Sequence, residues 1–356
     1  MIETLIDTYG DGAVLMMAGA LVGLIFGAAA QHSRFCLRAA SVEVSGRQFG
    51  PRLSIWLIAF CTGVAVVQAA IALEILDVTE SRQLSAIGSL SGAIIGGLMF
   101  GCGMILARGC ASRLLILSAT GNLRAVVSGL VLTLVAQSAL RGVLSPAREG
   151  IGSFWTVNGG EARDILALIS VGHGTAAIIF AVGIGIGLWL AISRGVPVTQ
   201  IIAGAVVGLA VALGWMLTYQ IAHTSFEVVA ISSVTFTGPS ADTLMGLVNS
   251  PNLPLGFGVG LVPGVFIGAA VTALLTREFQ IQRFGPDTPM ERYLIGATLM
   301  GFGSMLAGGC AVGAGMSGGA VFSLTAWVAV FFMWIGAMLT HVVLSRFDAA
   351  HGQALA

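Results

Sequence analysis

The sequence contains no lysine, and charged residues of any kind are scarce. All 16 basic residues are arginine, 16 acidic residues balance them, and charged side chains make up only 9% of the chain. A water-soluble domain normally carries about 25% charged residues, and the mean hydropathy of this chain is +0.96. We therefore expect an integral membrane protein. The balanced charge, with no basic run or tail, gives no indication of nucleic-acid binding.

Closely spaced cysteine pairs are also absent, since the chain has five cysteines and no C-x-x-C motif: Cys36, Cys61, Cys102, Cys110 and Cys310. An odd number of cysteines in apolar surroundings argues against a disulfide framework, so we expect free thiols. The histidines show no spacing typical of a metal or haem site. The sequence therefore predicts neither a bound metal nor a cofactor.

Long apolar runs predict an all-α protein, because a helix needs about 20 apolar residues to cross about 30 Å of hydrocarbon. We expect nine spans, at roughly 13–30, 53–75, 86–106, 125–143, 173–192, 198–218, 256–275, 293–307 and 321–344. Arginine is enriched in cytoplasmic loops of membrane proteins. If the N-terminus lies outside, twelve arginines fall in inner loops and four in outer loops. The arginine distribution therefore predicts an outside N-terminus and a cytoplasmic C-terminus.

Four connecting stretches are too apolar for ordinary loops and too short to span: 33–44, 109–120, 226–236 and 310–319. Broken or re-entrant helices are tolerated in a membrane only inside protein or beside a water-filled cavity. We therefore expect half-helices that fold into the bundle. The alternative is that these stretches are amphipathic segments lying flat on the membrane surface.

A six-residue motif occurs twice, as LARGCA at 106–111 and LAGGCA at 306–311. By the span assignment, the helix before the first copy runs inward and the helix before the second runs outward. Repeats of inverted topology place a shared site near the bilayer midplane. We therefore predict two inverted halves, 1–172 and 173–356, within a single membrane domain.

A weaker third copy of this context occurs near the N-terminus, where Arg34 and Cys36 match the spacing of Arg108 and Cys110. Three cysteines, Cys36, Cys110 and Cys310, thus follow the end of a predicted span at the point where a short helix begins. The remaining two cysteines lie inside spans. They are expected to pack as small hydrophobic residues.

A cysteine at the start of a half-helix lies among unpaired backbone N–H groups, at the positive end of the helix dipole. Glycines let a solute approach such amides closely, and the predicted supporting positions are Gly101, Gly109, Gly301, Gly308 and Gly309. A thiol adds a weak hydrogen-bond donor. Since a thiolate would repel an anion, we expect protonated thiols and a path without fixed charge, because passage needs weak sites in series.

These motifs resemble the YeeE/YedE family of bacterial inner-membrane thiosulfate-uptake proteins. The resemblance rests on Gly23, Phe26 and Gly27 with Arg34-Phe35-Cys36, and on residues 100–111 and 301–315. It implies nine spanning helices plus half-membrane helices, and import of thiosulfate through transient S–H hydrogen bonds. Carried over by motif, the thiols are Cys310 toward the outside, Cys110 near the centre or inside, and Cys36 toward the cytoplasm. It also implies a TusA-like sulfur carrier or a rhodanese-type enzyme as cytoplasmic partner.

Other functions stay open at this point. A membrane thiol-redox or sulfur-transfer protein would cycle a cysteine through a persulfide or a disulfide, and Cys102 and Cys110 are close enough in sequence to pair. The family relationship also allows another sulfur or selenium species as the substrate, and a scaffold subunit for a sulfurtransferase is a third class. The polar linker 144–172 receives no role from the sequence.

Overall fold

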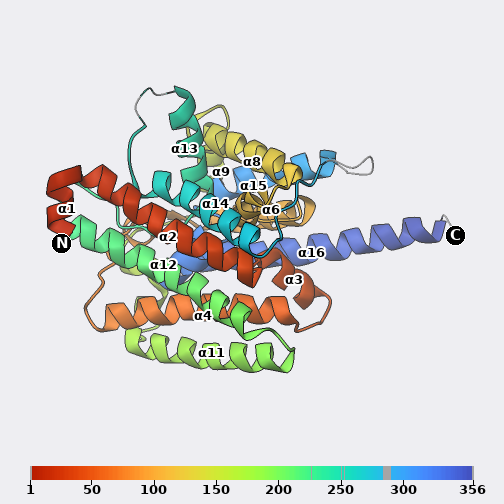
Figure 1. Cartoon of the computed structure of the whole chain (residues 1–356), viewed down its shortest axis with the longest axis horizontal. Helices are drawn as coiled ribbons and strands as arrows, with labels where there is room; N and C mark the ends of the chain where they lie inside the picture. Colours follow the sequence, from red (N-terminus) through yellow and green to blue (C-terminus); the bar gives the residue numbers. More distant parts are fainter. Residues whose placement is uncertain (1, 226, 250, 252, 284–289, 355–356) are drawn as a thin grey trace.

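The computed structural model describes residues 2–225, 227–249, 251, 253–283 and 290–354. They form a bundle of helices whose two ends carry the two chain termini (Figure 1). In the described residues, eight helical segments are long and apolar enough to cross a membrane. The only sheet there is a two-residue pair, in which β1 (Gly88–Ser89) lies antiparallel to β2 (Thr156–Val157). The prediction of an all-α polytopic membrane protein is confirmed.

The long helices follow the predicted spans in order. They are α2 (Asp11–Ser33), α4 (Pro51–Ala72), α6 (Leu90–Leu106), α8 (Leu123–Arg141), α11 (His173–Ser193), α12 (Val198–Thr224), α14 (Phe257–Leu275), α15 (Met290–Leu306) and α16 (Leu324–Ala354). The helix α15 is not among the eight membrane-length segments, because its 17 residues rise only about 25 Å. The chain unwinds directly after it, whereas the equally short α6 is followed by a second helix.

The two ends of the bundle carry different helices. We call the N face the end that holds α1 (Ile2–Tyr9), and the C face the end that holds α3 (Leu37–Ser45) (Figure 1). The connection from α8 to α11 lies at the N face and contains α9 (Ser145–Gly152), the 3-10 turn η1 (Glu161–Arg163) and α10 (Ile165–Leu168). The end of α16 projects from the C face (Figure 1).

Three of the four predicted half-helices contain helix. They are α3, α7 (Ala111–Ala119) and η2 (Gly313–Gly318), the last a single π-helical turn. All six residues of η2 and five of the nine in α7 are buried, so these two lie within the bundle. In α3, at the C face, three of the nine residues are buried.

The prediction of a half-helix at 226–236 is wrong. Residues 227–236 form neither helix nor strand, residue 226 is outside the described residues, and the helix α13 (Thr237–Asn249) begins only afterwards. Hydroxyl side chains replace helical hydrogen bonds here: Thr218 Oγ1 donates to the Ser232 carbonyl at 2.6 Å, and Ser233 Oγ donates to the Val211 carbonyl at 2.6 Å. The segment is also rich in β-branched residues, which favour extended backbone.

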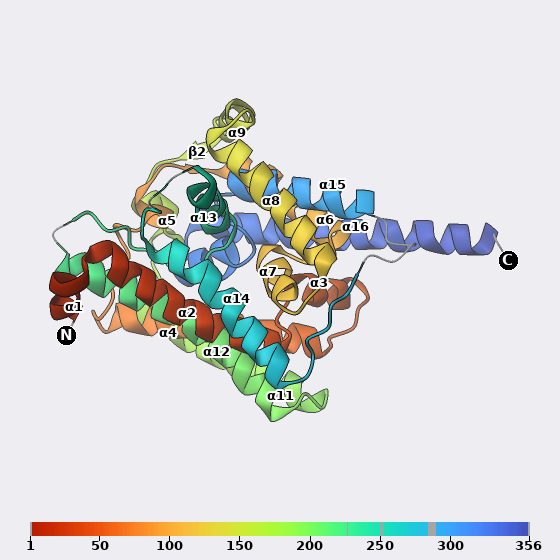
Figure 2. The same ribbon diagram turned by 45° about the horizontal axis from the view of Figure 1, so that its top comes forward.

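The helices α6 and α15 pack closely, and α15 lies between α6 and α8 (Figure 2). A Cβ added at Gly96 would lie 2.5 Å from the Gly303 carbonyl oxygen, and one at Gly296 would lie 2.7 Å from the Gly103 carbonyl oxygen. The two pairs are equivalent under the 200-residue repeat, because Gly96 corresponds to Gly296 and Gly103 corresponds to Gly303. The two helices are therefore antiparallel and cross in equivalent positions, as inverted repeats require. The boundary of the two halves at residue 172 stays a prediction.

Candidate functional site

Three chain breaks with the same backbone conformation lie within the bundle. Arg34, Arg108 and Gly308 each stand two positions before a cysteine, and all have a left-handed conformation, with φ of 56°, 57° and 79°. This conformation ends the preceding helix and turns the chain into the next segment. Cys36 and Cys110 then occupy the N-cap positions of α3 and α7. The weak third copy of the sequence motif thus shares with the two strong copies the left-handed residue two positions before the cysteine.

The three cysteines that follow these breaks are buried and close together. Cys36 is 9% exposed, Cys110 is 2% exposed and Cys310 is 1% exposed. The Cys110 thiol lies within electrostatic range of both other thiols. All five cysteines are free, as the sequence predicts.

Each of the two best-buried thiols contacts a polar group. The Cys110 Sγ lies 3.4 Å from Ser112 Oγ, so either atom can donate to the other. The backbone N–H of Gly313 donates to Cys310 Sγ at 3.4 Å. A backbone amide at the start of a helical turn is the kind of donor that an anion would use.

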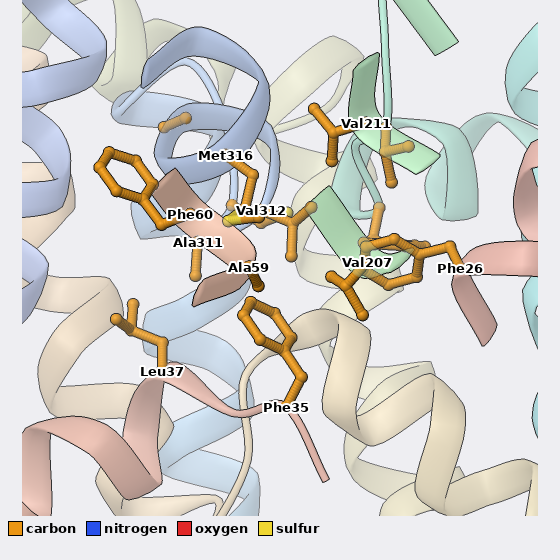
Figure 3. Close-up of a cluster of buried hydrophobic side chains, with 14 of the residues drawn as sticks. Phe26, Phe35, Leu37, Ala59, Phe60, Val207, Val211, Ala311, Val312 and Met316 are labelled. Carbon is orange, nitrogen blue, oxygen red and sulfur yellow. The ribbon is translucent and has the colours of Figure 1, made fainter. Parts of the chain in front are cut away.

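The surroundings of Cys36 and Cys310 belong to one hydrophobic cluster (Figure 3). Phe35 and Leu37 flank Cys36, and the Phe35 ring points toward Ala59 of α4, while Ala311 and Val312 follow Cys310 and lie on the other side of Ala59 (Figure 3). Apolar side chains therefore separate the thiols from lipid. The residues next to Cys36 and Cys310 thus pack into the same core, although they come from opposite ends of the sequence.

The glycines predicted to support this site fall into two groups. A Cβ at Gly308 would meet nothing within 4 Å, and one at Gly109 would make only ordinary contact with Leu114. A Cβ at Gly309 would lie 2.9 Å from the Ala314 amide nitrogen. The space around Gly109 and Gly308 is thus open, whereas Gly309 lies tightly against backbone, and the role of all three toward a solute stays a prediction.

Gly101 and Gly301 are placed differently. A Cβ at Gly101 would strike the Met333 carbonyl oxygen of α16, and one at Gly301 would lie 2.6 Å from the Leu132 carbonyl oxygen of α8. At these two positions glycine lets neighbouring helices approach each other, which is its usual use in membrane helices.

The two remaining cysteines pack between helices. Cys102 Sγ donates weakly to the Gly336 carbonyl of α16 at 3.7 Å. The Cys61 sulfur is buried against α11, where a Cβ at Gly183 would lie 2.8 Å from it. Since Cys102 faces α16 while Cys110 faces Ser112, the geometry offers no pairing of these two thiols.

A polar chain at the C face was missed by the sequence analysis. Arg113 donates to Gln31 Oε1 at 3.3 Å, Gln31 Nε2 donates to Glu278 at 2.8 Å, and Arg34 pairs with Glu278 at 3.1 Å. The Arg113 guanidinium also lies within electrostatic range of Cys36 and Cys110. A glutamine in the otherwise apolar end of α2 is the signal that could have revealed this chain.

An apolar helical bundle in which broken helices bring buried polar groups together is the architecture of a membrane transporter. The chain belongs to the sulphur transport family, which it matches over residues 32–339. This confirms the resemblance drawn from the cysteine motifs, and it places the protein among transporters rather than enzymes.

Two relatives match almost the whole chain. The thiosulfate transporter TsuA of Escherichia coli K12 is 25% identical over 349 residues, which cover 90% of this chain and 92% of the relative. The thiosulfate transporter TsuA of Spirochaeta thermophila is 26% identical over 340 residues, which cover 90% of this chain and 97% of the relative.

Proposed function

We propose that this chain imports thiosulfate, or a closely related sulfur oxyanion, across the bacterial inner membrane from the N face to the C face. The observation that carries the proposal is the set of three buried thiols, each two positions after a left-handed break and all within electrostatic range of Cys110. The names of the two relatives support thiosulfate as the substrate.

The thiols serve as weak, uncharged donors in series. Cys310 receives the anion first, Cys110 next and Cys36 last, and backbone N–H groups such as that of Gly313 assist. A protonated thiol donates a weaker hydrogen bond than a hydroxyl or an ammonium group. An anion can therefore leave each station, because conduction requires binding that is strong enough for entry and weak enough for exit.

The arginine distribution supports the membrane orientation on which the proposed direction of transport depends. Twelve of the 16 belong to loops and helix ends of the C face or its side of the bundle, and arginine is enriched on the cytoplasmic side of membrane proteins. Near Cys36, Arg38 lies within electrostatic range of Arg108, Arg124 and Arg292. A cationic C face supports a cytoplasmic position, with the N-terminus outside.

The same cationic surface suits an acidic partner that accepts the sulfur species, such as a TusA-like carrier or a rhodanese. Capture of a purified carrier by the detergent-solubilised protein tests this part of the proposal. Carrier binding at low salt that is lost in the variants Arg38→Gln and Arg292→Gln would support it. Equal binding by these variants would remove the arginines from the docking surface.

A growth assay tests the transport proposal. A bacterium without its own sulfate and thiosulfate uptake is supplied with thiosulfate as its sulfur source, and this chain should restore growth. Cys110→Ala and Cys310→Ala should abolish uptake of labelled thiosulfate. Cys61→Ala is the matched control, because it also removes a buried thiol but lies against α11. Membrane abundance of each variant is measured in parallel.

Two results would overturn the proposal. Full uptake by both Cys110→Ala and Cys310→Ala would remove the thiols from the path. Failure of the unchanged protein to restore growth, although it is present in the membrane, would exclude thiosulfate as the substrate. A stable mass gain of sulfur on Cys110 during turnover would instead favour sulfur transfer through a persulfide.

A further inference from the structure

The linker 144–172, which the sequence leaves without a role, forms the wall of a cavity at the N face. This cavity has a volume of about 510 Å³, and we call it the N-face chamber. Residues from three regions line it, among them Arg82, Gly88, Arg148, Arg163, Gly308 and Gly313. The N–H of Gly313 donates to Cys310 Sγ, so the floor of the chamber adjoins the outermost thiol of the proposed path.

Hydrogen bonds hold the linker in place as a wall. The strand β2 pairs with β1, so that Thr156 lies opposite Ser89. The N–H of Gly160 donates to the Leu84 carbonyl at 2.8 Å, and the N–H of Ile165 donates to the Phe322 carbonyl at 3.1 Å. The linker is thus fixed to the segment before α6 and to the segment before α16. Both of these segments line the chamber.

The chamber has an excess of positive charge. Arg82, Arg148 and Arg163 line it, and Glu149 is the one acidic residue among the described residues that do so, which gives three positive charges minus one, or +2. Glu149 pairs with Arg148 at 3.0 Å. Hydrogen bonds from Ser145 and then from Arg148 lower the pKa of Glu149, so its carboxylate is charged at neutral pH.

Arg163 is a buried cation that has no anionic partner among the residues that the structure describes. It is 7% exposed. Its Nη1 donates to the carbonyl oxygens of Arg82 and Ala86, and its Nη2 donates to Thr325 Oγ1 and Ser323 Oγ. All four acceptors are neutral, and its Nε has no hydrogen-bond partner in the described part of the chain.

The environment of Arg163 disfavours its charge, because burial and then the nearby Arg82 lower its pKa. A buried cation is normally paired, since an uncompensated charge in a protein interior is costly. Here the wall holds the guanidinium through neutral oxygens and leaves the positive charge uncompensated beside an open cavity. A ligand with two negative charges would balance the chamber.

We propose that the N-face chamber is a capture site for a divalent tetrahedral oxyanion, which waits there before it reaches Cys310. This inference rests on the proposed function and adds a charge-based entry step to it. Arg163 supplies a fixed charge, while Arg82 and Arg148 supply charges on more accessible side chains. A cleft lined by one sign of charge concentrates the opposite ion and raises its rate of entry, and the thiols deeper in the bundle then act on an anion already selected by charge.

Arg148 is the residue to test, because its one side-chain partner in the hydrogen bonds described is the adjacent Glu149. Arg163→Gln would also break the bonds that hold the wall and is less suitable. The matched control is Arg141→Gln at the end of α8, since Arg141 is exposed at the same face and does not line the chamber.

Uptake of labelled thiosulfate is measured as a function of concentration and salt. Arg148→Gln should raise KM about tenfold, the lower end of the gain from focused charge, with little change in the maximal rate. Arg148→Lys should stay near the unchanged protein, and Glu149→Gln should lower KM. Raised salt should weaken capture by the unchanged protein more than by Arg148→Gln.

Equilibrium binding of thiosulfate to the purified protein carrying Cys110→Ala separates this proposal from the transport proposal. Weaker binding with Arg148→Gln than with Arg141→Gln in that background supports the chamber, even if the protein transports a different anion. Equal binding and equal KM for these two variants would overturn the chamber proposal, even where Cys110→Ala abolishes uptake.

Discussion

The antiparallel crossing of α6 and α15 predicts that one added methyl group at either of two equivalent glycines will loosen the centre of the bundle. A Cβ at Gly103 would lie 2.5 Å from the Gly296 carbonyl oxygen and 2.8 Å from Met300 Cγ. A Cβ at Gly303 would lie 2.8 Å from the Gly96 carbonyl oxygen. Carbon atoms pack favourably at about 3.5–4.0 Å, so each alanine forces the helices apart by about 1 Å.

The size of the effect follows from two opposing contributions. Overpacking a tight contact costs about 1–3 kcal/mol, and replacing glycine by alanine in a helix gains about 1 kcal/mol from helix propensity. Gly129→Ala in α8 provides the reference, because a Cβ there meets nothing within 4 Å. The propensity gain is common to all three variants, so Gly103→Ala and Gly303→Ala should each be about 1–3 kcal/mol less stable than Gly129→Ala.

Thermal unfolding of the detergent-solubilised variants measures this difference, and thiosulfate uptake reports its effect on the site. Since α6 and α15 end just before the two breaks that lead to Cys110 and Cys310, both destabilised variants should also lose uptake, and to a similar extent. Unfolding midpoints that are the same for Gly103→Ala, Gly303→Ala and Gly129→Ala would refute the close crossing. A large effect at Gly103 alone would refute the equivalence of the two positions.

Three further perturbations test other parts of the structure. Gly308→Ala should lower the unfolding midpoint by an amount equivalent to about 1–2 kcal/mol, because alanine disfavours a left-handed conformation and nothing lies near enough to clash. Arg113→Gln should slow uptake about tenfold, or roughly 1.4 kcal/mol, at unchanged membrane abundance, since it removes a cation within electrostatic range of Cys36 and Cys110. Ser317→Ala should destabilise the protein by about 1–3 kcal/mol in a thermal shift assay, because Ser317 Oγ donates at 2.6 Å to the buried Val234 carbonyl.

The helices and the thiol cluster were accessible from the sequence because each has a local signature. Hydropathy alone locates the spans, and helix boundaries such as that of α11 (His173–Ser193) agree with the predicted 173–192. The repeated motif predicts where two cysteines stand. The left-handed conformations at Arg34 and Arg108 could not be predicted with the same ease, because this backbone normally favours glycine, which only the copy at 306–311 has, at Gly308.

Other features depend on contacts between distant residues and have no local signature. The segment 227–236 is not helical, although its apolar composition also suits a buried helix. Side-chain hydroxyls hydrogen-bond to backbone carbonyls here, from Thr218 to Ser232 and from Ser233 to Val211. The chamber wall depends on Arg163 reaching Ala86 and Thr325, which lie 77 and 162 positions away. No periodicity in the sequence predicts such pairings.

The arrangement of charge along the bundle suggests how a protein with clusters of arginine could still release an anion. Fixed positive charge lies at the two ends, around Arg163 at the N face and around Arg38 at the C face. The centre between them holds Cys110 and Cys310, with Ser112 and the Gly313 amide as their polar contacts. In the proposed path, charge at the ends would attract the anion and neutral donors in the centre would hold it only weakly, so the anion would meet no deep energy well on its way. Moving a fixed charge from either end to the centre would create such a well, which gives a physical reason for thiols, rather than arginines, at the two helix breaks.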